Sequence, residues 1–511
     1  MFLKPMHKNI LLSVLTGVLS ALSFPKMNLF FLMWIAMIPL FHVILNSSVK
    51  QSFFYALLAG LAGNMFALFF ILDSVELLAG SYIIAIFFYG ALCVYFSLYS
   101  GLLGAFLSFI KRYYSQPWIL ALMAACMWVI LEYIKTFTGW PWTLFGYTQY
   151  SFTYIIQIAE FTGVYGVSFA IILINGLLYF AVSKRKKSYL FSAAAIFAAI
   201  FIFGMFRYAA FQNFGEKEYT VAAVQSNIEQ YKKLDRRYAA ETNLHLEETA
   251  AKLSEIGADI NVWSESEIIN LIPADIDAYM FADKIAKTAG GFNIIGAPYL
   301  DGEGNLFGAI FYFDGGGGYV SMHTKNHLMP FGEYIPFGLS KFIDLGADNV
   351  NLNKVKGYDT VVFTDGDIYA GALICAENFF PTIVRRFVLA GAKVLTNNSN
   401  DAWFLDSSGP YKHFTANVFR AVESRRAVIA AANTGVSAII DASGKIAVST
   451  RVYERAIITG TFYQNDYLTF YMLYGDVFVM LCVLFIIISA GFIVYKKRLT
   501  AENREKIIDN S

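Results

Sequence analysis

Long apolar runs fill most of the first 210 positions of the chain, and one further run lies near its C-terminus. A helix needs about 20 predominantly apolar residues to cross the hydrocarbon core of a bilayer. The sequence predicts eight transmembrane helices, at about 10–25, 28–45, 53–72, 82–110, 117–135, 161–182, 189–210 and 469–495. The first run also has features of a signal peptide, because Lys4 and Lys8 precede its apolar core and the small-residue stretch 21–23 follows it.

Between the seventh and eighth runs, short β-branched stretches alternate with helical patterns. This alternation predicts an α/β domain, and four glycines at 315–318 indicate a hairpin turn within it. The predicted strands are Tyr219–Val224, Asp259–Trp263, Phe292–Gly296, Leu306–Phe313, Gly318–His323, Ile368–Ile374, Lys393–Asn397, Ala427–Ala432 and Ile457–Phe462. The predicted helices cover about 236–255, 275–289, 379–390 and 411–425. The chain therefore divides into seven transmembrane helices (1–210), the α/β domain (211–467) and an eighth helix with a tail (468–511).

The composition agrees with a membrane protein. Of the 511 residues, 57% are hydrophobic and 15% are charged, whereas soluble domains carry about 25% charged residues. This hydrophobicity excludes a disordered chain, and the net charge of +1 gives no basic surface for nucleic acid. Four cysteines in so long a chain exclude a disulfide scaffold.

Lysine and arginine indicate the orientation, because short loops rich in these residues stay in the cytoplasm. In an alternating arrangement of eight spans, one side carries Lys4, Lys8, Lys50, Lys111, Arg112, the run 184–187 and the run 496–498. The other side carries Asp73 and Glu76 and few lysines. The pattern predicts that both termini are cytoplasmic and that the α/β domain lies outside, which in a bacterium means the periplasmic side.

The membrane part offers few groups for chemistry of its own. Ionisable residues within spans are signs of transport, but here Glu132, Glu160 and Arg207 lie near predicted span ends, which disfavours a transporter. The loop 139–147 contains Gly-Trp-Pro-Trp. It fits either an aromatic belt at the membrane interface or a platform beneath the α/β domain.

Cys375 is the single cysteine of the α/β domain, because the other three lie within predicted spans. It is therefore either buried filler or a reactive group. It follows the apolar strand 369–374 and precedes a predicted helix. A helix N-terminus stabilises a thiolate and a developing oxyanion, so this placement favours a nucleophile.

A nucleophilic thiol needs a base and an electrostatic partner, and two other strand ends supply them. Glu265 follows an apolar strand, and Lys325 precedes Glu333 across an apolar loop that contains proline. Each residue alone is an ordinary surface charge or cap. Together they form a Glu/Lys/Cys set, in which Lys325 lowers the pKa of the Cys375 thiol and stabilises an oxyanion while Glu265 moves the proton.

With these motifs the chain resembles the nitrilase superfamily and, within it, the apolipoprotein N-acyltransferase family. Trp-x-Glu, Lys-x-x-x-x-Pro-Phe-Gly-Glu and Cys-x-Glu occur in order within the expected membrane layout, so the resemblance covers nearly the whole chain. It implies an αββα sandwich in which Glu265 is the general base, Lys325 the oxyanion-stabilising cation and Cys375 the nucleophile. The supporting residues that it implies are Glu333, Glu377, Asn305 and Trp403.

The resemblance also implies an activity. An acyl chain would pass from the sn-1 position of a phospholipid, through a cysteine thioester, to the N-terminal amine of diacylglyceryl-cysteine in an apolipoprotein. We expect a monomer in the bacterial cytoplasmic membrane that needs neither metal nor cofactor. Ser264, Ala376 and Leu234 replace the family's usual proline, tyrosine and aromatic residue. These departures leave the acyl-chain and peptide preferences open.

The segment 334–355 is rich in apolar residues, among them Tyr334, Phe337 and Phe342. It fits either a substrate-binding arm near the membrane or a helix packed on the core.

Two other classes of function are compatible with parts of the same sequence. A membrane-tethered amidase or nitrilase would use the same triad and pass the acyl group to water. A structural or transport protein with an inactive domain would lack a triad member, and all three are present.

Overall fold

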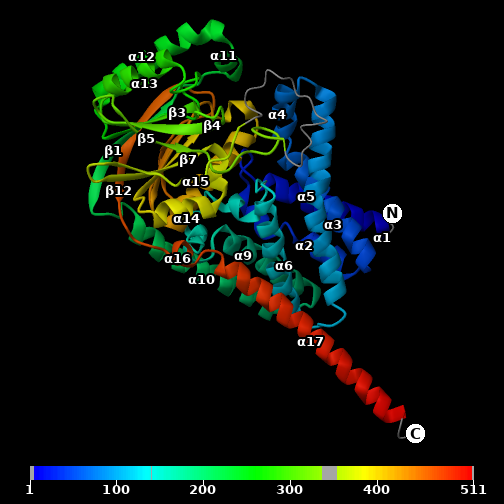
Figure 1. The fold of residues 1–511 in the computed structure, drawn as a ribbon. Coiled ribbons are helices and arrows are strands. Elements are labelled where there is room, and N and C mark those ends of the chain that lie inside the picture. Colours follow the sequence, from blue (N-terminus) through cyan, green and yellow to red (C-terminus); the bar gives the residue numbers. More distant parts are fainter. Residues whose placement is uncertain (1–4, 140, 336–353, 509–511) are drawn as a thin grey trace.

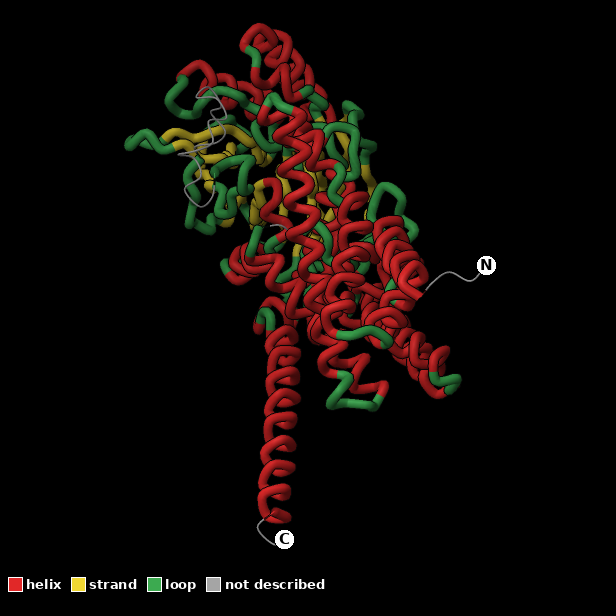
Figure 2. Tube along the Cα trace, turned by 90° about the vertical axis from the view of Figure 1, so that its right-hand side faces the viewer, coloured by secondary structure: helices red, strands yellow, loops and turns green. Residues whose placement is uncertain are grey.

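The computed structural model describes residues 5–139, 141–335 and 354–508 of the chain. One half is a bundle of helices from the N-terminal part, and the other half consists of two β-sheets with covering helices (Figure 1). The last helix, α17 (Val477–Ile508), returns along the helical half, and its end extends away from the rest of the molecule (Figure 2).

Several helices of the first half have the length and composition of membrane spans. The helices that precede the sheets are α1 (Pro5–Leu22), α2 (Ile38–Leu45), α3 (Val49–Ala67), α4 (Phe70–Ala79), α5 (Tyr82–Ile110), α6 (Pro117–Phe137), α7 (Thr153–Ile156), α8 (Ala159–Thr162), α9 (Val164–Ser183) and α10 (Lys187–Phe211). Within the described ranges, five are long and apolar enough to cross a membrane: α5, α6, α9, α10 and the part Val477–Lys497 of α17. A sixth span results if α3 and α4, which are bent by 63°, count as one.

The prediction of eight spans is thus confirmed only in part. The first run forms α1, which is helical over 18 residues but is not among the five. The run 28–45 splits into the 3-10 turn η1 (Phe30–Trp34) and the short α2. Pro39 lies in the first turn of α2, where a missing backbone N–H costs nothing, and it favours a new start there over a continuous helix. The run 53–72 is broken between Ala67 and Phe70.

The second half contains two six-stranded sheets. Their strands are β1 (Lys217–Gln225), β2 (Ile260–Val262), β3 (Phe292–Leu300), β4 (Leu306–Phe313), β5 (Tyr319–Thr324), β6 (Val362–Asp365), β7 (Ile368–Ile374), β8 (Val394–Ser399), β9 (Ala427–Ala432), β10 (Ala438–Ile440), β11 (Ile446–Ser449) and β12 (Ala456–Gln464). The order is β12-β1-β2-β3-β4-β5 in one sheet and β11-β10-β9-β8-β7-β6 in the other.

Three apolar clusters hold the layers together. The first lies between the sheets, where Val221 and Ile294 share a cluster with Ile429. The second joins the first sheet to α12 (Ala239–Ile256) and α13 (Ile276–Ala289). The third joins the outer face of the second sheet to α14 (Pro381–Leu389) and α15 (Gly409–Ser424), and it continues into the helical half. The result is an αββα sandwich with one helical layer against the membrane half (Figure 1).

All nine predicted strands and all four predicted helices of this half exist. The structure adds the short strands β6, β10 and β11 and the helix α11 (Gln230–Leu234). These three strands have only three or four residues each, which gives little alternation to recognise. The glycine run forms the turn between β4 and β5 as predicted, and Gly317 has a φ of +89° there.

Buried charges join the two halves. Glu160 of α8 accepts hydrogen bonds from Arg207 Nε at 2.6 Å and from Arg425 Nε, just after α15, at 2.9 Å. Arg425 also donates to Gln157 Oε1 at 2.7 Å, and both Glu160 and Arg425 are buried. Because a buried charge left without its partner is costly, this network should hold the sandwich in one position on the helices.

The network predicts a large loss of stability in Glu160→Gln. The change leaves the buried Arg425 guanidinium uncompensated, and loss of one partner of a buried pair costs about 3–5 kcal/mol. We expect a clearly lower melting temperature in detergent. The control Lys217→Met removes an exposed pair with Asp367 and should leave the melting temperature almost unchanged. Equal melting temperatures for the two variants would contradict a structural role of the network.

Candidate active site at the strand ends

Four strands end at one edge of the sandwich, and each is followed by a polar residue. In the first sheet β2 and β3 are parallel, and β5 runs in the same direction because two antiparallel pairings separate it from β3. In the second sheet β7, β8 and β9 are parallel. Glu265 follows β2, Lys325 follows β5, Cys375 follows β7 and Asn400 follows β8. The topology brings these four residues to one place.

The ammonium group of Lys325 lies between two carboxylates. Its Nζ donates to Glu265 Oε1 and to Glu333 Oε1, each at 3.0 Å, and all three side chains are buried. Burial lowers the pKa of Lys325, but the two carboxylates outweigh this effect and raise it well above the ordinary value. Lys325 is therefore a permanent cation.

Glu333 is held by more than Lys325. Its Oε1 also accepts from Lys354 Nζ at 3.0 Å, and its Oε2 accepts from the backbone N–H of Met329 at 3.0 Å. Burial raises the pKa of Glu333, yet Lys325 and Lys354 more than reverse this and keep it well below the usual range. Glu333 is thus a fixed anion that positions Lys325.

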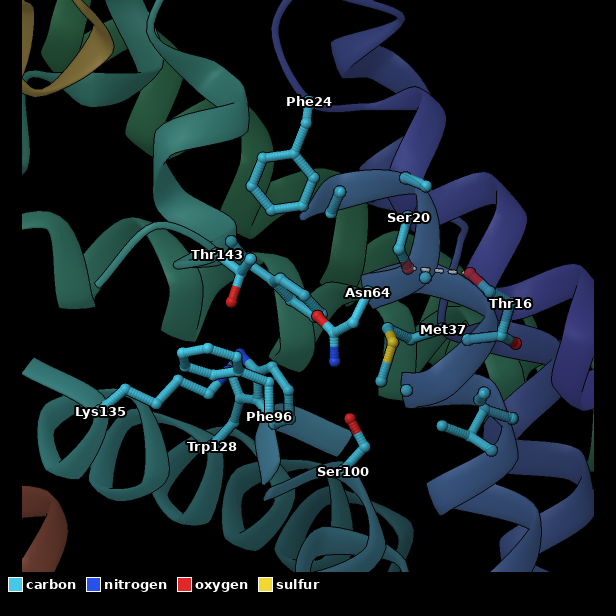
Figure 3. Close-up of a pocket in the computed structure, with 17 residues that line it drawn as sticks. Thr16, Ser20, Phe24, Met37, Asn64, Phe96, Ser100, Trp128, Lys135 and Thr143 are labelled. Atoms are coloured by element: carbon cyan, nitrogen blue, oxygen red, sulfur yellow. Dashed lines mark hydrogen bonds between the residues drawn. The ribbon is translucent and has the colours of Figure 1, made fainter. Parts of the chain in front are cut away.

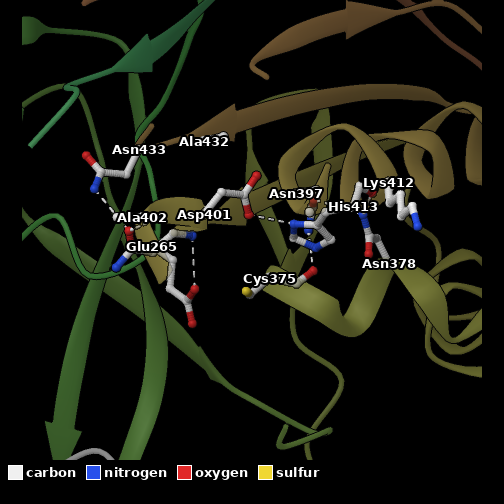
Figure 4. Close-up of polar contacts among 12 residues, drawn as sticks. Glu265, Cys375, Asn378, Asn397, Asp401, Ala402, Lys412, His413, Ala432 and Asn433 are labelled. Atoms are coloured by element: carbon white, nitrogen blue, oxygen red, sulfur yellow. Dashed lines mark hydrogen bonds and ion pairs between the residues drawn. The ribbon is translucent and has the colours of Figure 1, made fainter. Parts of the chain in front are cut away.

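Glu265 has a second partner in the other sheet. Its Oε2 accepts from the backbone N–H of Asn400 at 3.1 Å. The Asn400 side chain in turn accepts from the N–H of Ala402 and donates to Gln230 Oε1 at 2.9 Å. Figure 4 shows Glu265 and Cys375 on neighbouring segments below this turn. With Lys325 on one oxygen and Asn400 on the other, the carboxylate has one orientation.

Cys375 begins a sharp turn from strand to helix. It has a φ of +54°, a left-handed conformation that is unusual for a residue with a side chain. The 3-10 turn η6 (Cys375–Phe379) follows at once, and Asn397 Nδ2 holds the Cys375 carbonyl at 2.9 Å. Strained backbone of this kind clusters at active sites, where the surrounding contacts maintain it.

The surroundings of Cys375 act on its pKa in opposite directions. Lys325 lowers the pKa of the thiol, as the sequence predicts, but burial and then the Glu265 carboxylate raise it by more. The net pKa therefore lies well above the ordinary value of a thiol. At neutral pH the resting group is a thiol, and its proton must leave to a base as the sulfur attacks.

Glu377 connects two loops of the site through backbone hydrogen bonds. Its carboxylate accepts from the backbone N–H groups of Asn326 at 2.5 Å, His327 at 3.0 Å and Ile374 at 2.9 Å. Burial raises the pKa of Glu377 to about 7, although these hydrogen bonds lower it. The carboxylate thus ties the loop after β5 to the turn that carries Cys375.

A cavity of about 670 Å³ opens in front of the Cys375 sulfur, a size typical of small-molecule sites. Its polar end is lined by Glu265, Lys325, Glu333 and Cys375. Apolar and aromatic side chains from both halves contribute to its other walls, among them Phe70, Ile71, Val75, Leu78, Phe88, Trp142, Phe331, Trp403 and Phe404, and polar side chains such as Lys233 and Asn270 also line it. The cavity therefore places the reactive groups beside an apolar surface that can contact an apolar chain.

The Gly-Trp-Pro-Trp loop contributes to this cavity. Trp142 is buried against Phe70, Phe379 and Phe404, with ring centroids 5.0, 4.6 and 5.3 Å away. A belt tryptophan at a lipid interface would be exposed, so the position of Trp142 matches a platform beneath the sandwich. Trp140 lies outside the described residues.

Of the remaining predicted site residues, some line the cavity and others do not. Trp403 lines the cavity, and Tyr334 lies half-buried after the loop that carries Glu333. Asn305 does not line the cavity, because its side chain donates to Asp301 Oδ2 at 2.8 Å in the turn between β3 and β4. Phe337 and Phe342 of the predicted arm lie outside the described residues.

Three groups at the site had no signal in the sequence. Lys354 pairs with Glu333, and Lys233 lines the cavity and donates to the carbonyl of Ser266 at 3.1 Å. Behind Cys375, His413 Nδ1 lies 2.7 Å from Asp401 Oδ1, and both are buried (Figure 4). Spacing along the chain cannot reveal these partners, because each comes from a different element. Among the described residues, no group of three or more His, Cys, Asp or Glu side chains could hold a metal ion.

Comparisons with known proteins identify related sequences and structures. Residues 16–177 match the model of the apolipoprotein N-acyltransferase N-terminal domain, and residues 220–467 match that of carbon-nitrogen hydrolases. An apolipoprotein N-acyltransferase of Geobacter metallireducens is 32% identical over 93% of this chain and 94% of its own length. One of Thermotoga maritima is 26% identical over 98% and 96%. Among solved structures, an amidase from Nesterenkonia sp. matches with a TM-score of 0.38 and 18% identity, over 50% of this chain and 92% of that one.

The raised thiol pKa predicts slow alkylation at neutral pH. The reaction of Cys375 with iodoacetamide follows the thiolate fraction, so its rate should rise through a midpoint above the ordinary value of about 8.5. Lys325→Met should move the midpoint higher, because it removes the cation that lowers the thiol pKa. The exposed Lys284 pairs with Glu247 on the sandwich surface, so Lys284→Met should match the unmodified protein. Peptide mass spectrometry separates Cys375 from the buried cysteines, and a midpoint below 8.5 would contradict the assignment.

Proposed function

The chain belongs to the apolipoprotein N-acyltransferase family, and from this premise we propose that Cys375 carries the acyl group of a two-step transfer. The donor is the sn-1 ester of a membrane phospholipid, and the acceptor is the N-terminal amine of diacylglyceryl-cysteine in an apolipoprotein. One observation carries the proposal: Cys375, with the buried Lys325 cation and the fixed Glu265 carboxylate, lines a cavity that also has apolar walls, some of them from the helical half.

In the first step Glu265 accepts the thiol proton while the sulfur attacks the ester carbonyl. The tetrahedral oxyanion is stabilised by the Lys325 ammonium, which needs no reorganisation because Glu333 and Glu265 already hold it. The C–O bond then breaks, Glu265 returns the proton to the leaving alkoxide, and lysophospholipid departs. The acyl group remains on Cys375 as a thioester.

In the second step the free amine attacks the thioester carbonyl. Glu265 takes a proton from the amine, and Lys325 again stabilises the oxyanion. The C–S bond breaks, the proton from Glu265 restores the thiol, and the product is an amide. The same two residues thus serve both half-reactions of a ping-pong mechanism.

A tethered amidase or nitrilase is the competing function, since a Glu/Lys/Cys site can also pass the acyl group to water. The walls of the cavity favour the transferase. Phe70, Ile71, Val75 and Leu78 belong to α4 in the membrane half, and a small soluble amide would not need them. An apolar cavity that excludes water also protects a thioester until an amine arrives.

The substrates require a particular placement in the membrane. We propose a monomer with eight spans in the bacterial cytoplasmic membrane, with the sandwich on the periplasmic side and both termini in the cytoplasm. The support comes from the lysines and arginines on one side of the spans. In this arrangement α1, the η1–α2 segment and the bent pair α3–α4 each cross the membrane once, in addition to the five long helices.

The covalent step makes a direct prediction. Purified protein incubated with phospholipid, without acceptor, should gain the mass of one acyl group on the Cys375 peptide, and neutral hydroxylamine should remove it. A diacylglyceryl peptide with a free N-terminus should then take the acyl group as an amide, whereas its N-acetylated form should not. Cys375→Ala should gain nothing. Cys482→Ala, which changes a buried cysteine in α17, should behave as the unmodified protein. Free fatty acid with no amide would favour the hydrolase.

The orientation predicts unequal labelling of two exposed sites. A cysteine introduced as Gly316→Cys in the β4–β5 turn should react with an impermeant thiol reagent on intact spheroplasts. A cysteine introduced as Lys186→Cys, before α10, should react only after the membrane is opened. The parent protein lacks the four native cysteines, so each label reports one position. The reverse pattern would refute the proposed orientation and its substrates.

A further inference from the structure

A lysine of the sandwich is buried in the helical half. Lys412, in α15, is 2% exposed, and its Nζ donates a hydrogen bond to the backbone carbonyl of Ala67. The same Nζ lies 4.9 Å from the ring centroid of Phe24 and 5.6 Å from that of Phe70. Lys412 therefore reaches across the interface between the sandwich and the helical half, here called the seam, to the place where α3 ends and α4 begins.

The bend between α3 and α4 has no local cause in the sequence. Sharp helix bends arise at proline, at glycine or serine, or where a side chain enters the backbone hydrogen-bond ladder. The residues at the break are Met65-Phe66-Ala67-Leu68-Phe69-Phe70, none of which is a helix breaker. Two side chains bond to the backbone here, since the Tyr89 hydroxyl donates to the Met65 carbonyl and Lys412 to that of Ala67. Ala67 is the last residue of α3, where a carbonyl lacks a partner within the helix.

The protonation state of Lys412 does not decide this contact. Burial lowers the pKa of Lys412 to about 7. Both the ammonium and the neutral amine carry N–H groups, so either form can donate to the Ala67 carbonyl. The cationic form adds attraction to the C-terminal end of α3 and to the two rings.

The bend decides where a wall of the catalytic cavity lies. Phe70, Ile71, Ser74, Val75 and Leu78 of α4 line that cavity. Phe70 also packs against Trp142 and Phe404, with ring centroids 5.0 and 5.5 Å away. A shift of α4 would change the space available to an apolar chain in front of Cys375.

Lys412 itself does not line the catalytic cavity. In Figure 4 it points away from Cys375, whereas its neighbour His413 lies beside Asp401. A second, smaller cavity of about 40 Å³ lies in the helical half, with Phe24 and Ala67 among its lining residues (Figure 3). It has room for only a few water molecules. The segment Ala67 to Phe70 thus borders both cavities, with Ala67 at the small one and Phe70 at the catalytic one.

We propose that Lys412 is a positioning residue that fixes the bend between α3 and α4 and thereby sets the acyl-chain length accepted by the catalytic cavity. The inference rests on the proposed acyl transfer from phospholipid. Lys412 touches neither Cys375 nor the acyl chain, and it acts through the position of Ile71, Ser74 and Val75. Without its hydrogen bond, α4 is free to move towards the axis of α3, and the cavity no longer discriminates between chain lengths.

The test compares donors that differ only in chain length. Full-length Lys412→Met keeps the aliphatic stem between the two rings and loses the donor. Phospholipids with one head group and sn-1 chains of 10 to 18 carbons are offered with a diacylglyceryl peptide, and kcat/KM for lysophospholipid release is measured for each. We expect the ratio between the best and the worst chain to fall about tenfold in Lys412→Met. A ratio of rates is independent of the fraction of protein that is folded, so instability alone does not change it.

A matched control uses another lysine at the seam. Lys26 Nζ donates to the Asp406 carbonyl at 2.9 Å, but this contact is exposed and neither residue lines the catalytic cavity. Lys26→Met should keep the chain-length profile of the unmodified protein. Lys412→Arg retains an N–H donor and should keep most of the discrimination, and Lys412→Gln, with a shorter donor, should lose part of it.

The outcomes separate the two claims. If the unmodified enzyme discriminates and either Lys412→Met or Lys412→Gln keeps its profile, the role of Lys412 is wrong and the acyl transfer stands. If the unmodified enzyme releases no lysophospholipid from any donor, the proposed function fails, and this inference fails with it.

Discussion

One buried cation, the ammonium of Lys325, sets the architecture of the site. A charge removed from water is tolerated only when it is paired and hydrogen-bonded, and Lys325 obtains this from Glu265 and Glu333. Each carboxylate then needs its own partners, which are Asn400 for one and Lys354 for the other. Both sheets and the loops around them thus converge on a single charge. The groups that we propose as reacting are therefore held in place before a substrate arrives.

The same pairing explains why the thiol is not activated in advance. Burial and the Glu265 carboxylate raise the pKa of the Cys375 thiol by more than Lys325 lowers it, so the thiol pKa is high. Lys325 is itself paired with two carboxylates. A resting thiol is a poor nucleophile toward stray electrophiles. In the proposed mechanism it becomes reactive when a bound ester allows proton transfer to Glu265 and charge development beside Lys325 in one step. In the proposed two-step transfer, where the enzyme waits for two lipid substrates in turn, a resting thiol protects the sulfur.

Buried polar contacts also fix the sandwich to the helices. Glu160 binds Arg425, Glu423 accepts from the backbone N–H of Val164, and Lys412 holds the end of α3. Apolar packing across this seam is extensive but has no direction, whereas these contacts are directional. They place the strand ends over helix α4 and Trp142, so that one cavity contains both the Cys375 sulfur and apolar side chains of the helical half. The position of the two halves is therefore part of the active site.

The sequence by itself determined most elements of the fold and the residues that we propose as reacting groups. Apolar run length and alternation depend on neighbouring residues, so they predicted α5, α6, α9, α10 and nine strands, and Glu265, Lys325 and Cys375 followed from their places at strand ends. Only the tertiary structure decided what depends on contacts between distant segments. The break after Ala67 is held by Lys412, 345 positions further along the chain, and Lys354 and Asn400 join the site from separate loops. The sign of the Cys375 pKa shift also depended on tertiary structure, because burial and the sharing of Lys325 are properties of the folded site that no spacing of residues expresses.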